Sequence, residues 1–268
     1  MKLDGKVVAV TGGGSGIGRQ LVGELLTRGA RVAAVDIRQQ ALDETAGIAE
    51  AGDRLVTLVC DVTDRDGVGA LPGKVIDAHG AVDGLISNAG IIQPFVKLND
   101  LDYETIERVI DVNLYGTINM VKSFLPYLLE RPVAHIANVS SMGGFLPVPG
   151  QTIYGAAKAG VKLLTEGLYA ELLETNVGVS VIMPGAVATD ITSNSGVEIP
   201  GGIDVEAAAE SHRTTAPDEA ARIILDGIES DDLHIFVGRD SRTMNLLNRV
   251  APKRSTHIIQ KRMKDLLG

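Results

Sequence analysis

The sequence of 268 residues contains no tryptophan, and all aromatic residues together make up only 3% of it. Aliphatic and alanine side chains must therefore fill the core, and a hydrophobic content of 45% is enough to build one. The single cysteine, Cys60, excludes an intramolecular disulfide and fits a reducing, cytoplasmic location. The run around it, L-V-T-L-V-C-D, predicts a buried strand.

Long apolar runs and positive charge are scarce as well. No run approaches the roughly 18 residues that a membrane-spanning helix needs, and the apolar stretch in M-K-L-D-G-K-V-V-A-V is too short for a signal peptide. Lysine and arginine number 25 against 34 acidic residues, which gives a net charge of −9. We therefore predict no membrane span, no secretion and no general nucleic-acid binding, which needs a clustered positive surface.

What the sequence does contain is a series of short apolar runs that alternate with helical patterns. Such runs suit strands that are buried on both faces, and their alternation with helices predicts a parallel sheet. The expected strands are 6–11, 31–36, 55–61, 84–88, 133–140, 178–184 and 234–238. The predicted fold is a single-domain, doubly wound parallel α/β sheet with helices on both faces. Glycines and a proline predict an irregular surface helix near 66–73.

A glycine-rich turn, T-G-G-G-S-G-I-G, joins the first of these runs to a helical pattern. Glycines let the chain turn tightly and let phosphates approach the N–H groups at the positive end of a helix. The same turn without a ligand is the alternative. Its place between a strand and a helix favours dinucleotide binding, as in a Rossmann fold.

Asp36 ends the second run, 18 residues after Gly18, the last glycine of the turn. A carboxylate there accepts hydrogen bonds from ribose hydroxyls and repels a 2′-phosphate, so we expect NAD to be preferred over NADP. Arg38 is the counterargument, because a guanidinium could hold that phosphate. We interpret Arg38 as a solvent-facing residue at a helix start, since Ser15 rather than a basic residue precedes Gly16.

Tyr154 and Lys158 stand four residues apart in a helical pattern, so their side chains share one face. An ammonium beside a phenol favours the phenolate, and we expect Lys158 to lower the pKa of Tyr154 from its usual value of about 10. Ser141 lies 13 positions before Tyr154, and Ser140 is the alternative serine. Alone, such a Tyr–Lys pair is typical of a solvated helix face.

Together these motifs resemble the classical short-chain dehydrogenase/reductase family, and the match extends from Gly5 to about Gly238. Further motifs of the family follow the expected strands. Thr189 belongs to the last of these motifs, and the resemblance implies that it contacts the nicotinamide carboxamide. The family's active-site residues correspond to Asn113, Ser141, Tyr154 and Lys158. The expected cofactor-binding residues are Gly12, Ser15, Gly16, Ile17, Gly18, Asp36, Asp61, Val62, Asn88, Ala89, Gly90, Tyr154, Lys158, Pro184, Gly185, Val187 and Thr189.

The resemblance implies hydride transfer between NAD(H) and a secondary alcohol or ketone. Tyr154 would act as general base or acid on the hydroxyl proton, and Ser141 would hold the substrate oxygen. The resemblance further implies that Lys158 binds the nicotinamide ribose and that Asn113 anchors a water chain from Lys158 toward solvent. No metal is expected, because the five histidines lack ligand-like spacing.

The substrate is expected to meet mostly small or apolar side chains, which suits an apolar or small neutral alcohol. The expected pocket residues are Ser141, Gly143, Phe145, Val148 and Gln151, with the loop 190–203 beside them. Two alternatives stay open. One is an NADP-dependent ketoacyl or carbonyl reductase, which Asp36 and Ser15 disfavour. The other is a non-catalytic NAD-binding regulatory protein, which would be expected to have lost Tyr154, Lys158 or Ser141.

The C-terminal part of the chain differs from the rest in charge. From Arg239 onward eight basic residues face two acidic ones, a balance of +6 that leaves −15 upstream. A predicted helix there carries an apolar stripe of Ile259, Met263, Leu266 and Leu267 beside basic residues. We divide the chain into a catalytic NAD-binding domain, 1–240, and a basic helical extension, 241–268, packed on the same domain or a neighbouring subunit. Contact of this helix with an anionic membrane surface is the less favoured alternative, and the resemblance implies a homotetramer.

Overall fold

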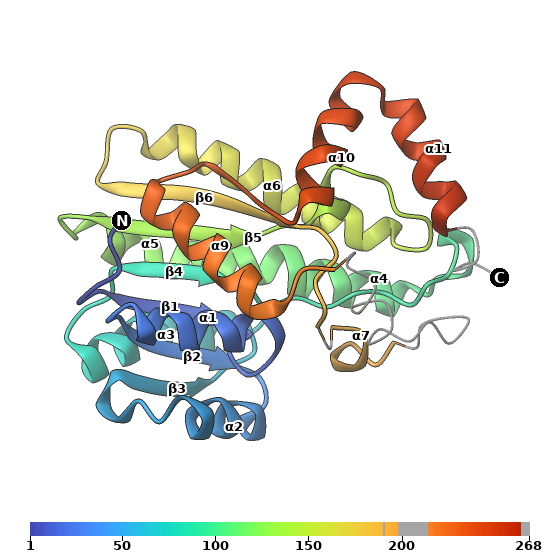
Figure 1. The fold of residues 1–268 in the computed structure, drawn as a ribbon. Coiled ribbons are helices and arrows are strands. Elements are labelled where there is room, and N and C mark those ends of the chain that lie inside the picture. Colours follow the sequence, from blue (N-terminus) through green and yellow to red (C-terminus); the bar gives the residue numbers. More distant parts are fainter. Residues whose placement is uncertain (190, 198–213, 264–268) are drawn as a thin grey trace.

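The centre of the structure is a parallel sheet that is covered by helices on both faces (Figure 1). This computed structural model describes residues 1–189, 191–197 and 214–263. The strands are β1 (Val7–Thr11), β2 (Arg31–Asp36), β3 (Leu55–Val59), β4 (Gly84–Ser87), β5 (Ala134–Val139), β6 (Val177–Pro184) and β7 (His234–Val237). They pair in parallel in the order β3-β2-β1-β4-β5-β6-β7, which confirms the predicted doubly wound fold. The order reverses between β1 and β4, where such sheets bind ligands at the carboxyl ends of their strands.

Two hydrophobic cores lie on opposite faces of this sheet. The first face carries α1 (Gly16–Thr27), α2 (Gln39–Ala49) and α9 (Pro217–Ser230). The other carries α3 (Arg65–His79), α5 (Gly116–Leu129) and α6 (Thr152–Leu172), with α4 (Tyr103–Ile110) packed on α6. Shorter elements are the 3₁₀ turns Gly52–Arg54, Leu98–Asp100 and Met142–Gly144, the π-helical turn Asp111–Tyr115, and α7 (Ile191–Asn194). Cys60 follows directly after β3 and is buried, as expected, but the expected buried strand is wrong: β3 lies at the edge of the sheet, and its residues are half-buried or exposed.

Helix α3 corrects the expectation of an irregular surface helix. It runs without a break over 15 residues. The carboxylate of Asp64 caps its start by accepting from the Asp66 N–H, and Gly80 ends it in the left-handed conformation at φ 82°. Pro72 and Leu71 lie on its buried face. Burial against the sheet therefore outweighs the low helix propensity of this segment.

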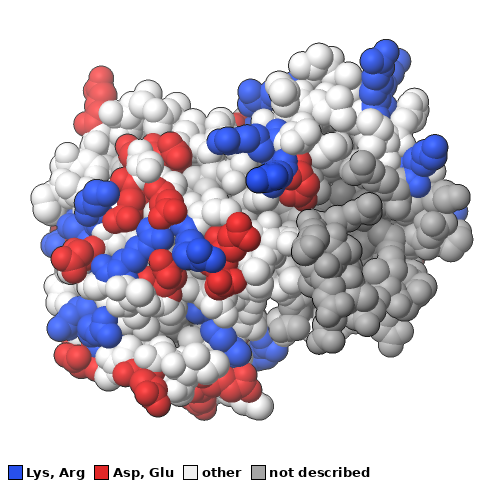
Figure 2. Space-filling model, in the orientation of Figure 1, with Lys and Arg blue, Asp and Glu red and all other residues white. Residues whose placement is uncertain are grey.

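The C-terminal extension is a helical hairpin of α10 (Arg239–Val250) and α11 (Pro252–Met263) beyond the carboxyl ends of the strands (Figure 1). Met244 and Ile259 are buried against Leu146. Ile259, a residue of the predicted apolar stripe, therefore faces the protein body. Leu266, Leu267 and the Met263 side chain lie outside the described residues. Figure 2 shows mostly basic side chains on the hairpin, whereas both signs of charge mix over the body. Within the described ranges, no helix combines the length and apolarity needed to cross a bilayer.

Candidate active site

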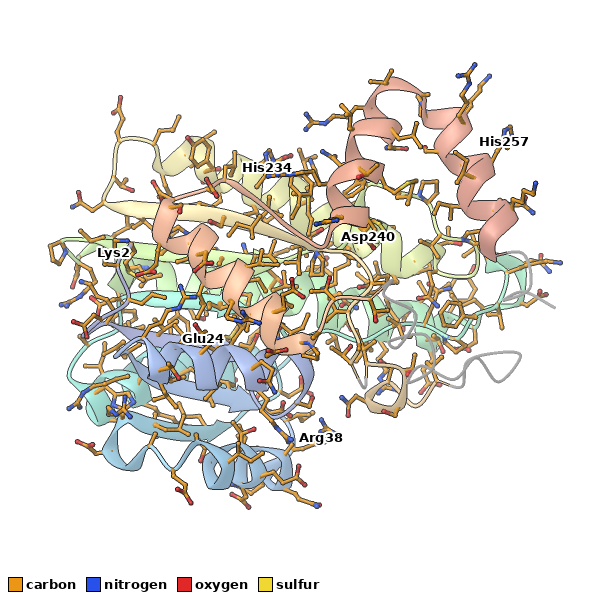
Figure 3. The ribbon with its side chains drawn as sticks, viewed as in Figure 1. Lys2, Glu24, Arg38, His234, Asp240 and His257 are labelled. Carbon is orange, nitrogen blue, oxygen red and sulfur yellow. The ribbon has the colours of Figure 1, made fainter. Side chains whose placement is uncertain are left out.

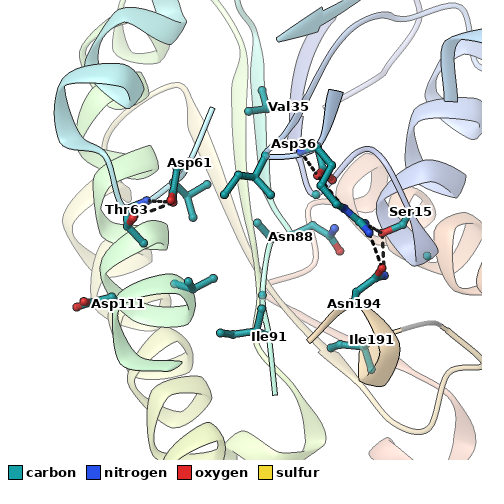
Figure 4. A pocket seen from close by; sticks show the side chains of 18 of the residues that line it. Ser15, Val35, Asp36, Asp61, Thr63, Asn88, Ile91, Asp111, Ile191 and Asn194 are labelled. Atoms are coloured by element: carbon teal, nitrogen blue, oxygen red, sulfur yellow. Dashed lines mark hydrogen bonds and ion pairs between the residues drawn. The ribbon is translucent and has the colours of Figure 1, made fainter. Parts of the chain in front are cut away.

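A cavity of about 560 Å³ opens at the carboxyl edge of the sheet, where the strand order reverses (Figure 4). The predicted cofactor residues that line it are Gly12, Ser15, Gly16, Ile17, Asp36, Asp61, Val62, Asn88, Ala89, Gly90 and Thr189. They come from loops that are distant in sequence, and the topology of the sheet brings them together. The volume lies in the range of small-molecule and cofactor sites.

The glycine turn packs too closely against its neighbours to carry side chains at two of its positions. Gly12 has a φ of 67°, and a Cβ on it would lie 2.8 Å from Asn88 Nδ2. A Cβ on Gly18 would overlap the carbonyl oxygen of Gly12. Ser15 begins α1 without a capping hydrogen bond from its side chain, so the first N–H groups of this helix are available to a phosphate. The turn therefore fits the diphosphate of a dinucleotide.

The segment after β4 is tied to this turn by hydrogen bonds. Thr11 Oγ1 accepts from the N–H groups of Asn88 at 2.9 Å and Ala89 at 3.0 Å. Asn88 Nδ2 donates to the Thr11 carbonyl at 3.0 Å. These bonds hold the walls of the cavity at a fixed distance from one another.

The Asp36 carboxylate is fixed at the wall of the cavity by two backbone hydrogen bonds. Oδ2 accepts from the Gly14 N–H at 3.1 Å, and Oδ1 accepts from the Arg38 N–H at 3.0 Å. Arg38 is exposed at the start of α2, as expected, but it also reaches toward α7 (Figure 3). Its Nη1 donates to Asn194 Oδ1 at 2.8 Å and its Nη2 to Ser15 Oγ at 3.3 Å.

The charged residues around the cavity are mostly acidic. The acidic lining residues are Asp36, Asp61, Glu104, Glu107 and Asp111, and the basic ones are Arg38 and Arg108. Asp61 Oδ1 accepts from the N–H and the hydroxyl of Thr63, both at 2.8 Å, which fixes the turn after β3. Such a lining disfavours an additional phosphate in the cavity.

The two candidate serines after β5 have different surroundings. Ser140 is buried, and its hydroxyl donates to the Lys158 carbonyl at 2.7 Å. Ser141 accepts from the Gly143 N–H at 3.0 Å, and its side chain lies close enough to the Tyr154 phenol to oppose a rise in the pKa of that phenol. Ser141 is therefore the serine whose side chain lies beside Tyr154, and its contact with a substrate stays a prediction.

Lys158 is buried below Tyr154 and is 3% exposed. Its ammonium donates to the Val139 carbonyl at 2.9 Å and lies 5.9 Å from the centre of the Tyr154 ring. Burial lowers the pKa of Lys158 to about 8. Burial also raises the pKa of Tyr154, and the Ser141 hydrogen bond opposes this only in part. The expected lowering of the Tyr154 pKa is therefore wrong for the chain alone, because loss of hydration outweighs the effect of Ser141.

Asn113 lies fully buried in the π-helical turn before α5. Its Nδ2 donates to the carbonyls of Ile91 and Val109, each at 2.9 Å. Its Oδ1 has no partner among the described residues. A Cβ on Gly90 would lie 2.6 Å from this Oδ1 and 3.1 Å from Lys158 Nζ, so both polar atoms flank one glycine. A buried acceptor of this kind is a place for an ordered water.

Residues 6–199 match the family model described as short chain dehydrogenase. The chain belongs to the short-chain dehydrogenase family. Among curated proteins, it is 34% identical to SadH of Mycobacterium tuberculosis over 254 residues, which are 92% of this chain and 91% of SadH. It is also 34% identical to the 3-oxoacyl-[acyl-carrier-protein] reductase FabG of Thermotoga maritima over 253 residues, 89% of this chain and 96% of FabG.

Solved structures of short-chain dehydrogenases share this architecture, and they include a complex with NAD and a complex with NADP. One from Burkholderia phymatum in complex with NAD has a TM-score of 0.81 and 27% identity, and the match covers 93% of this chain and 96% of that one. One from Burkholderia cenocepacia in complex with NADP also has a TM-score of 0.81, with 26% identity over 97% and 99% of the two chains. As a short-chain dehydrogenase, the chain is thus an oxidoreductase with a nucleotide-binding fold.

The remaining predicted positions lie on the side of β6 and the C-terminal hairpin. Pro184 ends β6, and the Gly185 N–H donates to the Val237 carbonyl at 2.9 Å. Val187 pairs with Thr215 in an isolated bridge. The expected substrate residues Gly143, Phe145 and Val148 are half-buried on the turn after Ser141. Of the loop 190–203, residue 190 and residues 198–203 lie outside the described part of this dehydrogenase.

Gln151 departs from its expected place in the substrate pocket. Its side chain is buried, and Nε2 donates to the Gln93 carbonyl at 2.7 Å. Sequence reasoning also missed Gln93 itself and Asn194. The only feature of the sequence that could have indicated Gln93 is its position three residues after Gly90, a glycine of the family motif that follows the fourth strand. Neither residue belongs to a local pattern that identifies its partner.

Proposed function

We propose that the chain is an NAD-dependent oxidoreductase that interconverts a secondary alcohol and a ketone, and that its substrate is apolar or small and neutral. The observation that carries this proposal is the grouping of Tyr154 with the neighbouring Ser141 side chain and the buried Lys158, whose ammonium lies 5.9 Å from the centre of the phenol ring. Gly90 links this group to the cavity, because it lines the cavity and flanks Lys158 Nζ. The half-buried Phe145 and Val148 supply an apolar approach.

In the proposed reaction each side chain has one task. The bound dinucleotide would supply the hydride acceptor at its nicotinamide ring. Tyr154 takes the hydroxyl proton as the hydrogen on the same carbon departs as hydride, and Ser141 donates a hydrogen bond to the substrate oxygen. Since burial raises the pKa of Tyr154, its neutral form prevails at pH 7 and suits proton donation in reduction. In oxidation, the Lys158 cation has to stabilise the phenolate, and Asn113 Oδ1 holds a water that carries the proton onward.

The preference for NAD is supported by the fixed Asp36 carboxylate and the acidic lining of the cavity. The alternative is an NADP-dependent reductase of ketoacyl thioesters or other carbonyls. Arg38 at the rim and the similarity to FabG favour that alternative. Measured dissociation constants for NAD and NADP would distinguish them, and Arg38→Ala would weaken only NADP binding if the guanidinium held its 2′-phosphate.

The test is NADH formation by the purified protein with a panel of secondary alcohols that runs from short diols to sterols. Turnover that Tyr154→Phe abolishes, with NAD affinity retained, would support the proposal. NAD binding without turnover across the panel and across matched ketones would favour a non-catalytic regulatory protein.

We also propose a cytoplasmic homotetramer that pairs the surfaces of α4 and α6. Tyr103 on α4 and Leu163 on α6 are 81% and 71% exposed, so each helix presents a large apolar side chain that a partner could cover. Light scattering after size-exclusion chromatography would give the mass, and a monomeric mass would contradict the proposal.

A further inference from the structure

Helix α6, which carries Tyr154, begins without a cap of its own. Gln151 stands at the capping position and makes no capping hydrogen bond with its side chain. Instead, Gln93 Oε1 accepts from the N–H groups of Ile153 at 2.9 Å and Tyr154 at 3.0 Å. These are first-turn donors that otherwise have no intrahelical partner. A residue about 60 positions away therefore caps the helix, and one of its two bonds is to Tyr154 itself.

The main chain of Gln93 strengthens this attachment. Its carbonyl accepts from Gln151 Nε2 at 2.7 Å, so its side chain and its main chain both bind the start of α6. Gln93 is fully buried, which excludes water as a substitute for the lost bonds. The same stretch of chain reaches the other active-site groups, because the Ile91 carbonyl accepts from Asn113 Nδ2 at 2.9 Å.

We propose that Gln93 is a positioning residue for Tyr154. An oxygen that accepts two consecutive N–H groups holds the first turn of α6 in one rotation about the helix axis. That rotation directs the Tyr154 hydroxyl toward the neighbouring Ser141 side chain. The inference rests on the proposed function, in which Tyr154 exchanges a proton with the substrate. Gln93 itself need not touch the substrate.

The first test compares two substitutions that differ only in the acceptor. Gln93→Met keeps the length and removes the oxygen, whereas Gln93→Glu keeps an acceptor oxygen in either protonation state. We expect kcat to fall about tenfold to a hundredfold in Gln93→Met, with the KM for NAD unchanged, because small misplacements of a reacting group have effects of this size. Gln93→Glu should recover most of the loss.

The second test does not depend on turnover. With ¹³Cζ-labelled tyrosine, the signal of Tyr154 can be assigned by its loss in Tyr154→Phe, and its titration followed by NMR. Gln93→Met should raise the Tyr154 pKa further, since the Ser141 hydrogen bond that opposes burial is weakened. The control is Lys162→Met on the same helix, which loses the 2.6 Å bond to Glu166 on the surface and should change neither kcat nor this titration.

The outcomes separate the two proposals. If the wild-type protein turns over no substrate but the Tyr154 titration shifts in Gln93→Met, the proposed function fails and the positioning role stands. A folded Gln93→Met variant with wild-type Tyr154 titration overturns the positioning role. So does a wild-type kcat in this variant when the parent enzyme is active.

Discussion

The ammonium group of Lys158 is buried with the Val139 carbonyl as its acceptor, and its pKa falls to about 8 from 10.5. A lysine in the unfolded chain keeps its proton up to the higher value. Between these two values the unfolded state binds more protons than the folded state, so stability rises with pH through this window. At pH 7 the folded protein therefore carries the full cost of burying this charge.

We predict that Lys158→Met makes the cofactor-free protein more stable at pH 7 by roughly 2 kcal/mol. This is the free energy that corresponds to the pKa shift of Lys158, minus the contribution of the hydrogen bond that the substitution removes. The gain should vanish above about pH 10.5, where Lys158 is neutral in both the folded and the unfolded chain. Urea unfolding at both pH values measures it. The matched control is Lys162→Met one turn later, whose surface pair with Glu166 should contribute at most about 1 kcal/mol. A Lys158→Met protein no more stable than the wild type would contradict the prediction.

At the scale of elements, the C-terminal hairpin is joined to the turn after Ser141 by one side chain. Asn248 Nδ2 donates to the Phe145 carbonyl at 2.7 Å, and its Oδ1 accepts from the Ser255 hydroxyl at 2.8 Å. The first bond connects α10 to the substrate side, and the second connects α10 to α11. The hairpin thus supports the turn that presents Phe145.

We expect Asn248→Ala to lower stability by about 1–2 kcal/mol and to raise the KM for the alcohol more than the KM for NAD. Steady-state kinetics with each reactant varied in turn would show the difference. Arg249→Ala, its exposed neighbour on α10, is the control and should leave both constants unchanged. An equal rise in both KM values would mean that the hairpin supports the whole site.

The elements also show what the sequence can and cannot predict. The strands and the glycine turn are predictable because their signals are local: apolar runs buried on both faces, and glycines between a strand and a helix. The continuous α3 is not, since Pro72 and its neighbouring glycines disfavour a helix until the sheet buries one side of it. The cap that Gln93 provides and the bonds of Arg38 to Ser15 and Asn194 depend on residues brought together only by the fold.

At the scale of the whole molecule, the end of the sheet opposite the cavity contains an acid-sensitive group. His135 near the start of β5 is buried, with Nε2 at 2.9 Å from the Ser180 hydroxyl. Burial lowers its pKa from 6.5 to about 3. Between these values the unfolded chain binds one more proton than the folded one. Stability due to His135 is therefore present above pH 6.5 and is lost as the pH falls toward 3.

We predict that His135→Gln, which retains a donor toward Ser180, flattens this dependence by up to about 1.4 kcal/mol per pH unit. Urea unfolding of both proteins at pH 7, 5.5 and 4.5 gives the two slopes, and their comparison removes the contribution of carboxylates that titrate in both. Equal slopes would show that His135 is not the acid-sensitive group. Activity at pH 7 should be unaffected, since His135 lies at the other end of the strands.

Ser15 on the glycine turn accepts a hydrogen bond from Asn194 Nδ2 at 3.1 Å, and Arg38 holds the same asparagine. If the dinucleotide binds the Ser15 hydroxyl, as we predict from the sequence, it competes with α7 for that side chain. In kinetic terms, Asn194 would then have to release Ser15 before the cofactor is captured. The observed rate of NAD binding in stopped-flow measurements should then level off at high concentration, at the rate of that release, rather than rise linearly.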